Sequence, residues 1–219
     1  MVVLRVNKIM SIFSMDNAFF RFMGKVTDLV WLNILTLICC IPIFTMGAAF
    51  SAMYHVLIKI AIKEEGVVTR PFFREFKANF KNATIVWVPS LIILLIMFSN
   101  AYLIYQGVLN PYPKLMIVVG ISIGIISAAV LMFLNYYFAL ISRYDNDVKQ
   151  YIKNALLMMI AYFPRSLCML VIMAFPIALM TISNYFLFFW FLYGFSFPGF
   201  FNSMLLGSLF LKTEKVNQD

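Results

Sequence analysis

Charged residues are scarce in this chain, and their scarcity decides its class. Only 12% of the 219 residues are charged, 63% are hydrophobic, and the mean hydropathy is +0.93. A soluble domain normally carries about 25% charged residues, and no polar segment here is long enough to form one separately. The sequence therefore excludes an ordinary soluble protein and predicts an all-α membrane protein that crosses the bilayer several times.

Residues that carry chemistry are equally few. His55 is the only histidine, and the three cysteines Cys39, Cys40 and Cys168 lie inside apolar runs, where thiols behave as small hydrophobic groups. No Walker-type phosphate loop, HExxH or Cys-x-x-Cys motif occurs. We therefore expect no enzyme activity, no cofactor and no metal site. The 17 Lys and Arg gather between the apolar runs, which explains their excess over 9 Asp and Glu without nucleic-acid binding.

The first apolar run, residues 26–62, is too long for one crossing. Lys25 and Lys63 bound it, and as a straight helix it would measure about 55 Å against the roughly 30 Å of bilayer hydrocarbon. It is either one bent span or two spans joined in a hairpin. Pro42 and the small residues that begin at Gly47 mark the position of a turn.

The distribution of positive charge favours the hairpin. With a hairpin, every cluster of Lys and Arg falls on one side of the membrane, and Lys114 alone falls on the other. Cytoplasmic loops carry the excess of Lys and Arg, so both termini are predicted to be cytoplasmic. A single bent span would place the cations Arg5, Lys8, Arg21 and Lys25 outside, against this bias. A re-entrant pair of helices that stops short of the far surface would give the same sidedness and stays open.

About six transmembrane helices in three hairpins, joined by short amphipathic cytoplasmic helices, are thus predicted for a multi-pass protein of the plasma membrane. The chain forms a single transmembrane domain. Its predicted parts are an N-terminal amphipathic segment (1–25), a first hairpin (26–62), a cytoplasmic amphipathic segment (63–82), a second hairpin (83–141), another such segment (142–165), a third hairpin (166–211) and a tail (212–219). Pro176 and Pro198 are expected to kink the last two spans.

Two kinds of surface in this topology suit a protein partner. One is the amphipathic segment in which Phe72, Phe76 and Phe80 recur every four residues with Lys77 and Lys81 beside them. Such a stripe suits the lipid headgroup region or a cytoplasmic partner. The other kind is a row of small residues at four-residue spacing, which lets helix backbones approach closely, within the bundle or against another subunit. These rows are Gly120, Gly124 and Ala128, and Gly199, Ser203 and Gly207.

Polar side chains inside the predicted spans are few enough to name. They include Asn33 and His55 in the first hairpin and Asn135 and Asn202 in later spans. Proton relays and ion-coupled transporters generally need ionisable groups in the membrane, and the spans offer almost none. Hydrogen bonds between helices are the expected role of these residues, with a part in a solute pathway as the alternative.

The segment "WLNILTLICCIPIFTMGAAFSAMYHVL" resembles the N-terminal signature of the YesL family of bacterial membrane proteins. The residues that carry the resemblance are Asn33, Leu35, Pro42-x-x-Thr45-x-Gly47, Ala52, Tyr54 and His55. "FFREFKANFKNATIVW" (72–87) resembles a second landmark of that family, and "FPGFFNS" (197–203) is similar to its last span. We expect Pro42 and Gly47 to shape the hairpin turn, with the Thr45 hydroxyl bonding carbonyls that the proline frees.

What the resemblance implies is a context rather than a chemistry. Members of the family tend to be encoded beside carbohydrate ABC importers of Gram-positive bacteria, and they have no established catalytic residues. The expected function is therefore a non-catalytic accessory subunit that contacts the permease subunits of such an importer, and possibly its ATPase, and assists its assembly, stability or regulation. An autonomous transporter or channel for a small solute is the alternative.

Overall fold

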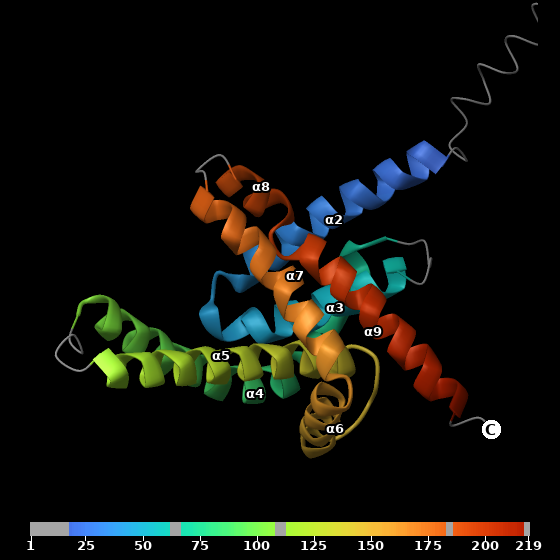
Figure 1. Ribbon diagram of the computed structural model, residues 1–219. Coiled ribbons are helices and arrows are strands. Elements are labelled where there is room, and N and C mark those ends of the chain that lie inside the picture. Colours follow the sequence, from blue (N-terminus) through green and yellow to red (C-terminus); the bar gives the residue numbers. More distant parts are fainter. Residues whose placement is uncertain (1–17, 62–66, 108–112, 183–185, 217–219) are drawn as a thin grey trace, which may run out of the picture.

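The computed structural model describes residues 18–61, 67–107, 113–182 and 186–216, and within them every regular element is a helix. Figure 1 shows the arrangement. The elements are α2 (Ala18–Cys40), the 3-10 helix η1 (Ile43–Thr45), α3 (Met46–Ala61), α4 (Thr69–Tyr105), α5 (Pro113–Ile141), α6 (Val148–Ala161), α7 (Phe163–Ile182), α8 (Phe186–Tyr193) and α9 (Ser196–Val216). The prediction of an all-α membrane protein is confirmed.

Five helical segments in the described residues are long and apolar enough to cross a membrane. They are Met23–Cys40, Ile43–Ala61, Thr69–Tyr105, Lys114–Ile141 and Phe163–Met180. These segments correspond to the first five of the six predicted spans. The number of actual crossings and the side on which the termini lie stay predictions.

The helices group as hairpins around a buried centre. In Figure 1 the C-terminal ends of α2, α4 and α7 lie toward the left, whereas the start of α2 and the end of α9 lie on the right. α3 is the central helix, because 67% of the most apolar 18-residue stretch of Ile43–Ala61 is buried, against only 11% of the corresponding stretches of α5 and α7. Small residues such as Ala48 and Ala52, both fully buried, allow neighbouring helices to pack closely around it.

The second predicted amphipathic segment is not a separate helix. Residues 69–82 and the span that follows form the single helix α4, which at 37 residues is about 55 Å long. Nothing between Asn82 and Ala83 interrupts the backbone, and Pro89 lies inside the helix without ending it. The first turns of α4 therefore cannot lie flat in the membrane surface while the rest crosses. They must continue the span beyond the hydrocarbon.

The third predicted amphipathic segment does form its own helix, α6, which a short link joins to the end of α5. Tyr151 on α6 closes this link, since its hydroxyl donates to the carbonyl of Tyr144 and accepts from the backbone N–H of Asn146 (2.9 Å). Burial raises the pKa of Tyr151, and the nearby Asp145 carboxylate adds to the effect while the Asn146 hydrogen bond opposes it. The first predicted amphipathic segment lies mostly outside the described residues.

The last predicted span, 185–211, is divided into α8 and α9. The division falls at Gly194, where a Cβ atom would lie 2.4 Å from the carbonyl oxygen of Trp190, so that only glycine fits. Pro198 does not kink the helix as expected. It lies in the first turn of α9, where its missing N–H would have no helical partner in any case.

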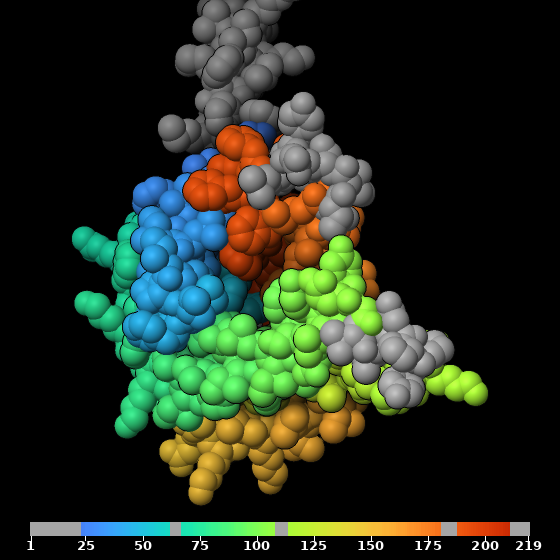
Figure 2. Space-filling model, turned by 90° about the vertical axis from the view of Figure 1, so that its left-hand side faces the viewer, coloured from blue at the N-terminus to red at the C-terminus, as the bar shows by residue number. Residues whose placement is uncertain are grey.

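The hairpin of α4 and α5 extends beyond the other helices. Its far half projects to the left in Figure 1, away from the packed centre. Figure 2 looks at the molecule from that side and shows a recess bounded by α2, by the α4/α5 hairpin and by α7 to α9. The helices thus pack tightly around α3 and splay apart toward the ends of the hairpins.

Candidate functional site

The turn of the first hairpin is held by a threonine hydroxyl. The Oγ1 atom of Thr45 lies 2.5 Å from the carbonyl oxygen of Cys39 and 2.6 Å from that of Pro42, so its proton is shared between the end of α2 and the turn. Thr45 is buried, whereas Pro42 is exposed. Backbone carbonyls without helical partners must be satisfied inside a membrane protein, and Thr45 does this as predicted.

Gly47 has a different role from the one predicted. It lies inside α3 rather than in the turn, and it faces α4. A Cβ atom at position 47 would stand 2.6 Å from the Cβ of Trp87 and 3.1 Å from the carbonyl oxygen of Ala83. The indole Nε1 of Trp87 donates to the carbonyl of Ile43 (2.8 Å), which ties α4 to the turn. Gly47 is therefore a contact residue between helices.

Asn33 joins three helices through a single buried amide. Its Oδ1 accepts from the backbone N–H groups of Phe195 and Ser196, both at 3.0 Å, and its Nδ2 donates to the carbonyl of Phe191 at 2.7 Å. The side chain is fully buried. The break between α8 and α9 leaves backbone groups that their own helices cannot satisfy, and Asn33 on α2 satisfies three of them. The interhelical role expected for Asn33 is thus present.

A second polar cluster links α3, α5 and α9 in the interior. The hydroxyl of Tyr54 donates to Oδ1 of Asn135 (2.5 Å), and Nδ2 of Asn202 lies 3.4 Å from the same oxygen and 3.5 Å from the carbonyl of Met169. All three side chains are buried. Their polar atoms bond to one another and to the carbonyls of Leu131 and Met169, and Oδ1 of Asn202 is the one atom of the three side chains with no partner among the described residues. The cluster therefore joins helices and offers few free groups to a passing solute.

His55 lies where α3 meets α4 and the end of α5. Its Nδ1 donates to the carbonyl of Ser142 (2.7 Å), and its Nε2 lies 3.7 Å from Oε1 of Glu75. The Glu75 carboxylate also accepts from Arg74 and Asn79. This arrangement ties three helices together near the start of α4. Among the described residues it brings no metal-ligand set to the histidine.

The aromatic stripe on α4 faces inward. Phe72 is fully buried, and Phe76 and Phe80 pack partly buried against the core. The three rings contact one another in sequence, with centroid distances of 6.4 Å and 5.8 Å. In this structure they therefore hold α4 to its own bundle, whereas the neighbouring Lys77 and Lys81 are exposed.

The two rows of small residues differ in whether they are buried in the bundle or exposed. A Cβ atom at Gly199 would lie 2.8 Å from Leu57, and Ser203 is fully buried, so these two positions pack inside the bundle. Gly207 is also buried, although a Cβ there would have no other atom within 4 Å. Gly120 and Gly124 on α5 are exposed, and an added Cβ at either would have no other atom within 4 Å. Ala128 is half-buried. The row on α5 is thus the one that remains open.

Residues 120–124 also spell Gly-Ile-Ser-Ile-Gly, which has the letters of the hydrolase pattern Gly-x-Ser-x-Gly. In hydrolases the serine of that pattern stands on a sharp turn between a strand and a helix. Here Ser122 lies in the middle of α5, and its hydroxyl donates to the carbonyl of Val119 in the same helix (2.8 Å). The pattern therefore does not form a nucleophile site.

Comparison with known proteins agrees with the resemblance over residues 29–101, about a third of the chain. Residues 29–101 match the family described as "Protein of unknown function, DUF624", which is the family of the YesL-like proteins. The match covers Asn33, the Thr45 turn, Gly47 and Trp87, the residues that organise the first hairpin and its contact with α4. No significant match is found among curated proteins or solved structures. Over this region, the chain is similar to a family of membrane proteins defined by sequence and not by a known activity.

Proposed function

We propose that the protein is a non-catalytic accessory subunit that associates, within the plasma membrane, with the permease subunits of a carbohydrate ABC importer. The observation that supports a lateral partner most directly is the far half of the α4/α5 hairpin. In the most apolar 18-residue stretch of α5 only 11% of the residues are buried within the described chain, and in that of α4 22% are.

The exposed part of this hairpin is apolar, and its glycines leave room for the close approach of another helix. Phe98 on α4 is 71% exposed and Ile125 on α5 is 65% exposed. Lipid chains cover apolar side chains equally well, so hydrophobicity alone does not favour a protein partner. Gly120 and Gly124 lie one turn apart and have nothing packed over them, and a helix of another subunit can approach the α5 backbone closely there.

The choice of an importer as partner rests on the resemblance to the YesL family and its association with carbohydrate importers. A second contact on the cytoplasmic side fits the basic residues in the first turns of α4 and on α6. Lys77 and Lys81 on α4 and Lys149 and Lys153 on α6 are all exposed. They are available to the permease or to its ATPase near the membrane surface.

The experiment is co-purification of the tagged protein in a mild detergent from its native cell. Importer subunits are expected in the eluate of the wild-type protein. Gly124→Phe should reduce their recovery at least several-fold, because a bulky side chain keeps the partner helix away. The variant should still fold, since the space over Gly124 is open in this chain. Gly24→Phe is the matched control, because Gly24 on α2 is equally open.

Two results would overturn this proposal. One is the absence of importer subunits from the eluate together with unchanged oligosaccharide uptake in a deletion strain. The other is solute flux in vesicles that contain this chain alone, abolished by substitutions at Asn135 or Asn202. That result would favour the autonomous transporter, for which the buried amides are the best candidate residues.

A further inference from the structure

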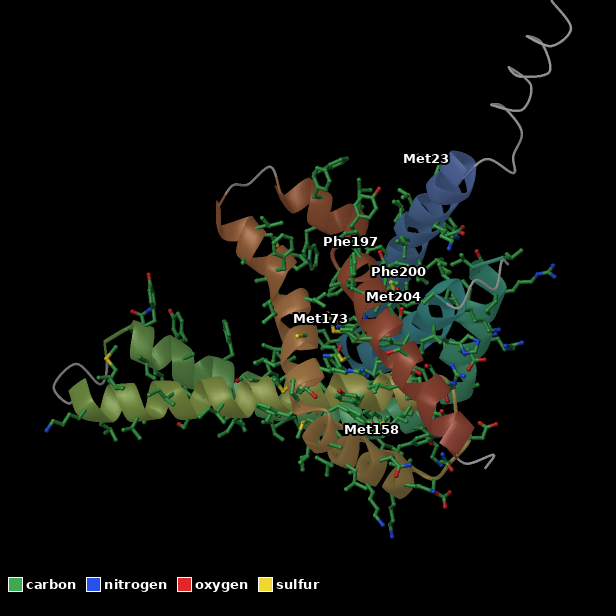
Figure 3. All side chains as sticks on the ribbon, turned by 45° about the vertical axis from the view of Figure 1, so that its right-hand side comes forward. Met23, Met158, Met173, Phe197, Phe200 and Met204 are labelled. Carbon is green, nitrogen blue, oxygen red and sulfur yellow. The ribbon has the colours of Figure 1, made fainter. Side chains whose placement is uncertain are left out.

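An apolar groove opens between α2, α7, α8 and α9, apart from the α5 row and the polar clusters. Its volume is about 550 Å³, within the usual range for sites that bind small molecules. Lining residues on α7 and α8 include Phe175, Leu179 and Trp190. Figure 3 shows Phe197 and Phe200, from the first turns of α9, between α7 and α8 on one side and α2 on the other.

The lining excludes a polar ligand such as a free sugar. Seven aromatic side chains form most of the wall, and the remaining contacts are almost all aliphatic. A sugar would lose its hydrogen bonds with water and gain almost none in return. A long hydrocarbon chain loses no hydrogen bonds here, and because the groove is partly open such a chain would be able to enter it from a surrounding bilayer.

Lys25 is the one charged residue in the lining. It lies on α2 one turn before Leu29, which also lines the groove, and it directly precedes the first apolar run of the sequence. It lies near the N-terminal end of the candidate span Met23–Cys40, which the predicted topology places at the headgroup level of the membrane. Among the described residues no carboxylate pairs with Lys25. The groove therefore presents an apolar wall with a positive charge at its α2 side.

We propose that this groove binds an anionic phospholipid, with one acyl chain against the aromatic wall and the headgroup phosphate at the Lys25 ammonium. The lipid would touch Trp190 and Gly194 next to the break between α8 and α9. α8 has only eight residues. The bound acyl chain would fill the space that remains between α8 and the helices α2, α7 and α9. The proposal is independent of the importer association.

Tryptophan fluorescence tests the proposal in vesicles of phosphatidylcholine that contain a small fraction of lipid with brominated acyl chains. The chain has three tryptophans, and the difference in quenching between wild type and Trp190→Phe isolates the residue in the groove. Brominated phosphatidylglycerol should quench Trp190 at a mole fraction about fivefold lower than brominated phosphatidylcholine, which is the effect of one Lys near an anionic lipid.

Substitutions at the groove and away from it separate the binding site from general attraction to lipid. Lys25→Gln should remove the preference and Lys25→Arg should keep it. Lys77→Gln, which removes the same charge from the exposed face of α4, should change nothing. Leu179→Phe fills the groove without changing the charge, and it should weaken quenching of Trp190 by phosphatidylglycerol. Equal quenching by the two lipids in wild type, or a preference that survives Lys25→Gln, would overturn the proposal.

Discussion

Trp87 occupies the space in which a side chain at position 47 would stand. The nearest approach, 2.6 Å between a Cβ atom at Gly47 and the Cβ of Trp87, is closer than any pair of carbon atoms tolerates without movement. The same indole donates a hydrogen bond to Ile43 in the turn of the first hairpin. One contact thus fixes both the separation of α3 from α4 and the conformation of the turn.

Gly47→Ala should lower the stability of the protein by about 1–3 kcal/mol, because the added methyl forces α3 and α4 apart. Thermal unfolding in detergent, followed by the far-ultraviolet circular dichroism of the helices, measures the effect. Gly124→Ala is the control, since the space over Gly124 is open, and it should leave the unfolding temperature unchanged or slightly raised. Equal unfolding temperatures for wild type and Gly47→Ala would contradict this role of Gly47.

Asn33→Leu should loosen the break between α8 and α9. The substitution leaves the N–H groups of Phe195 and Ser196 and the carbonyl of Phe191 without their partner, at a cost of about 1–3 kcal/mol for each buried group. Hydrogen exchange at Phe195 and Ser196 should become faster, while amides in the middle of α3 keep their protection. Unchanged exchange at these two amides would show that Asn33 is not what holds the break.

Tyr151→Phe should destabilise the link between α5 and α6, because the N–H of Asn146 and the carbonyl of Tyr144 lose the hydroxyl that joins them. We expect a loss of about 1–3 kcal/mol. The pKa of Tyr151 is raised in the folded state, so its contribution to stability is present below the unfolded pKa of about 10 and is lost as pH rises through the folded pKa. The unfolding temperature of the wild type should therefore fall more steeply above about pH 10 than that of Tyr151→Phe, which lacks this titrating hydroxyl.

The predicted topology places Val67 on the cytoplasmic side and Gln106 on the outer side. In a background without Cys39, Cys40 and Cys168, a thiol at position 106 should react with a membrane-impermeant reagent on intact cells, and a thiol at position 67 should react only after lysis. Both residues are exposed. Reaction at position 67 on intact cells would show that the protein is oriented the other way or that the first hairpin does not form.

Patterns that depend on local chemistry could be predicted well from the sequence. The hairpin at Pro42, the bond made by Thr45 and the helical class follow from apolar run length, proline position and the satisfaction of backbone groups. The direction of a face could not be predicted, because periodicity shows which residues share a face and not what covers it. The sequence predicts that Phe72, Phe76 and Phe80 face the lipid headgroups or a cytoplasmic partner, whereas they pack on the bundle of this chain.

The break at Gly194 was missed for a related reason. Residues 185–211 form one continuous apolar run, and the sequence around Gly194 offers only a single glycine against the stronger signal of Pro198. The break depends on Asn33, more than 150 positions earlier in the chain, whose amide satisfies the ends of both helices. No pattern within the span itself contains that information.

Site-specific photo-cross-linking in native membranes tests the central claim, that the open face of α5 is covered by an importer subunit. A photoreactive residue is placed at Gly124, with one at Gly24 as the control, because a side chain has open space at both. The account predicts a cross-link from position 124 to a permease subunit of a carbohydrate importer and none from position 24. Cross-links from position 124 to lipid alone, in cells that express the importer, would contradict it.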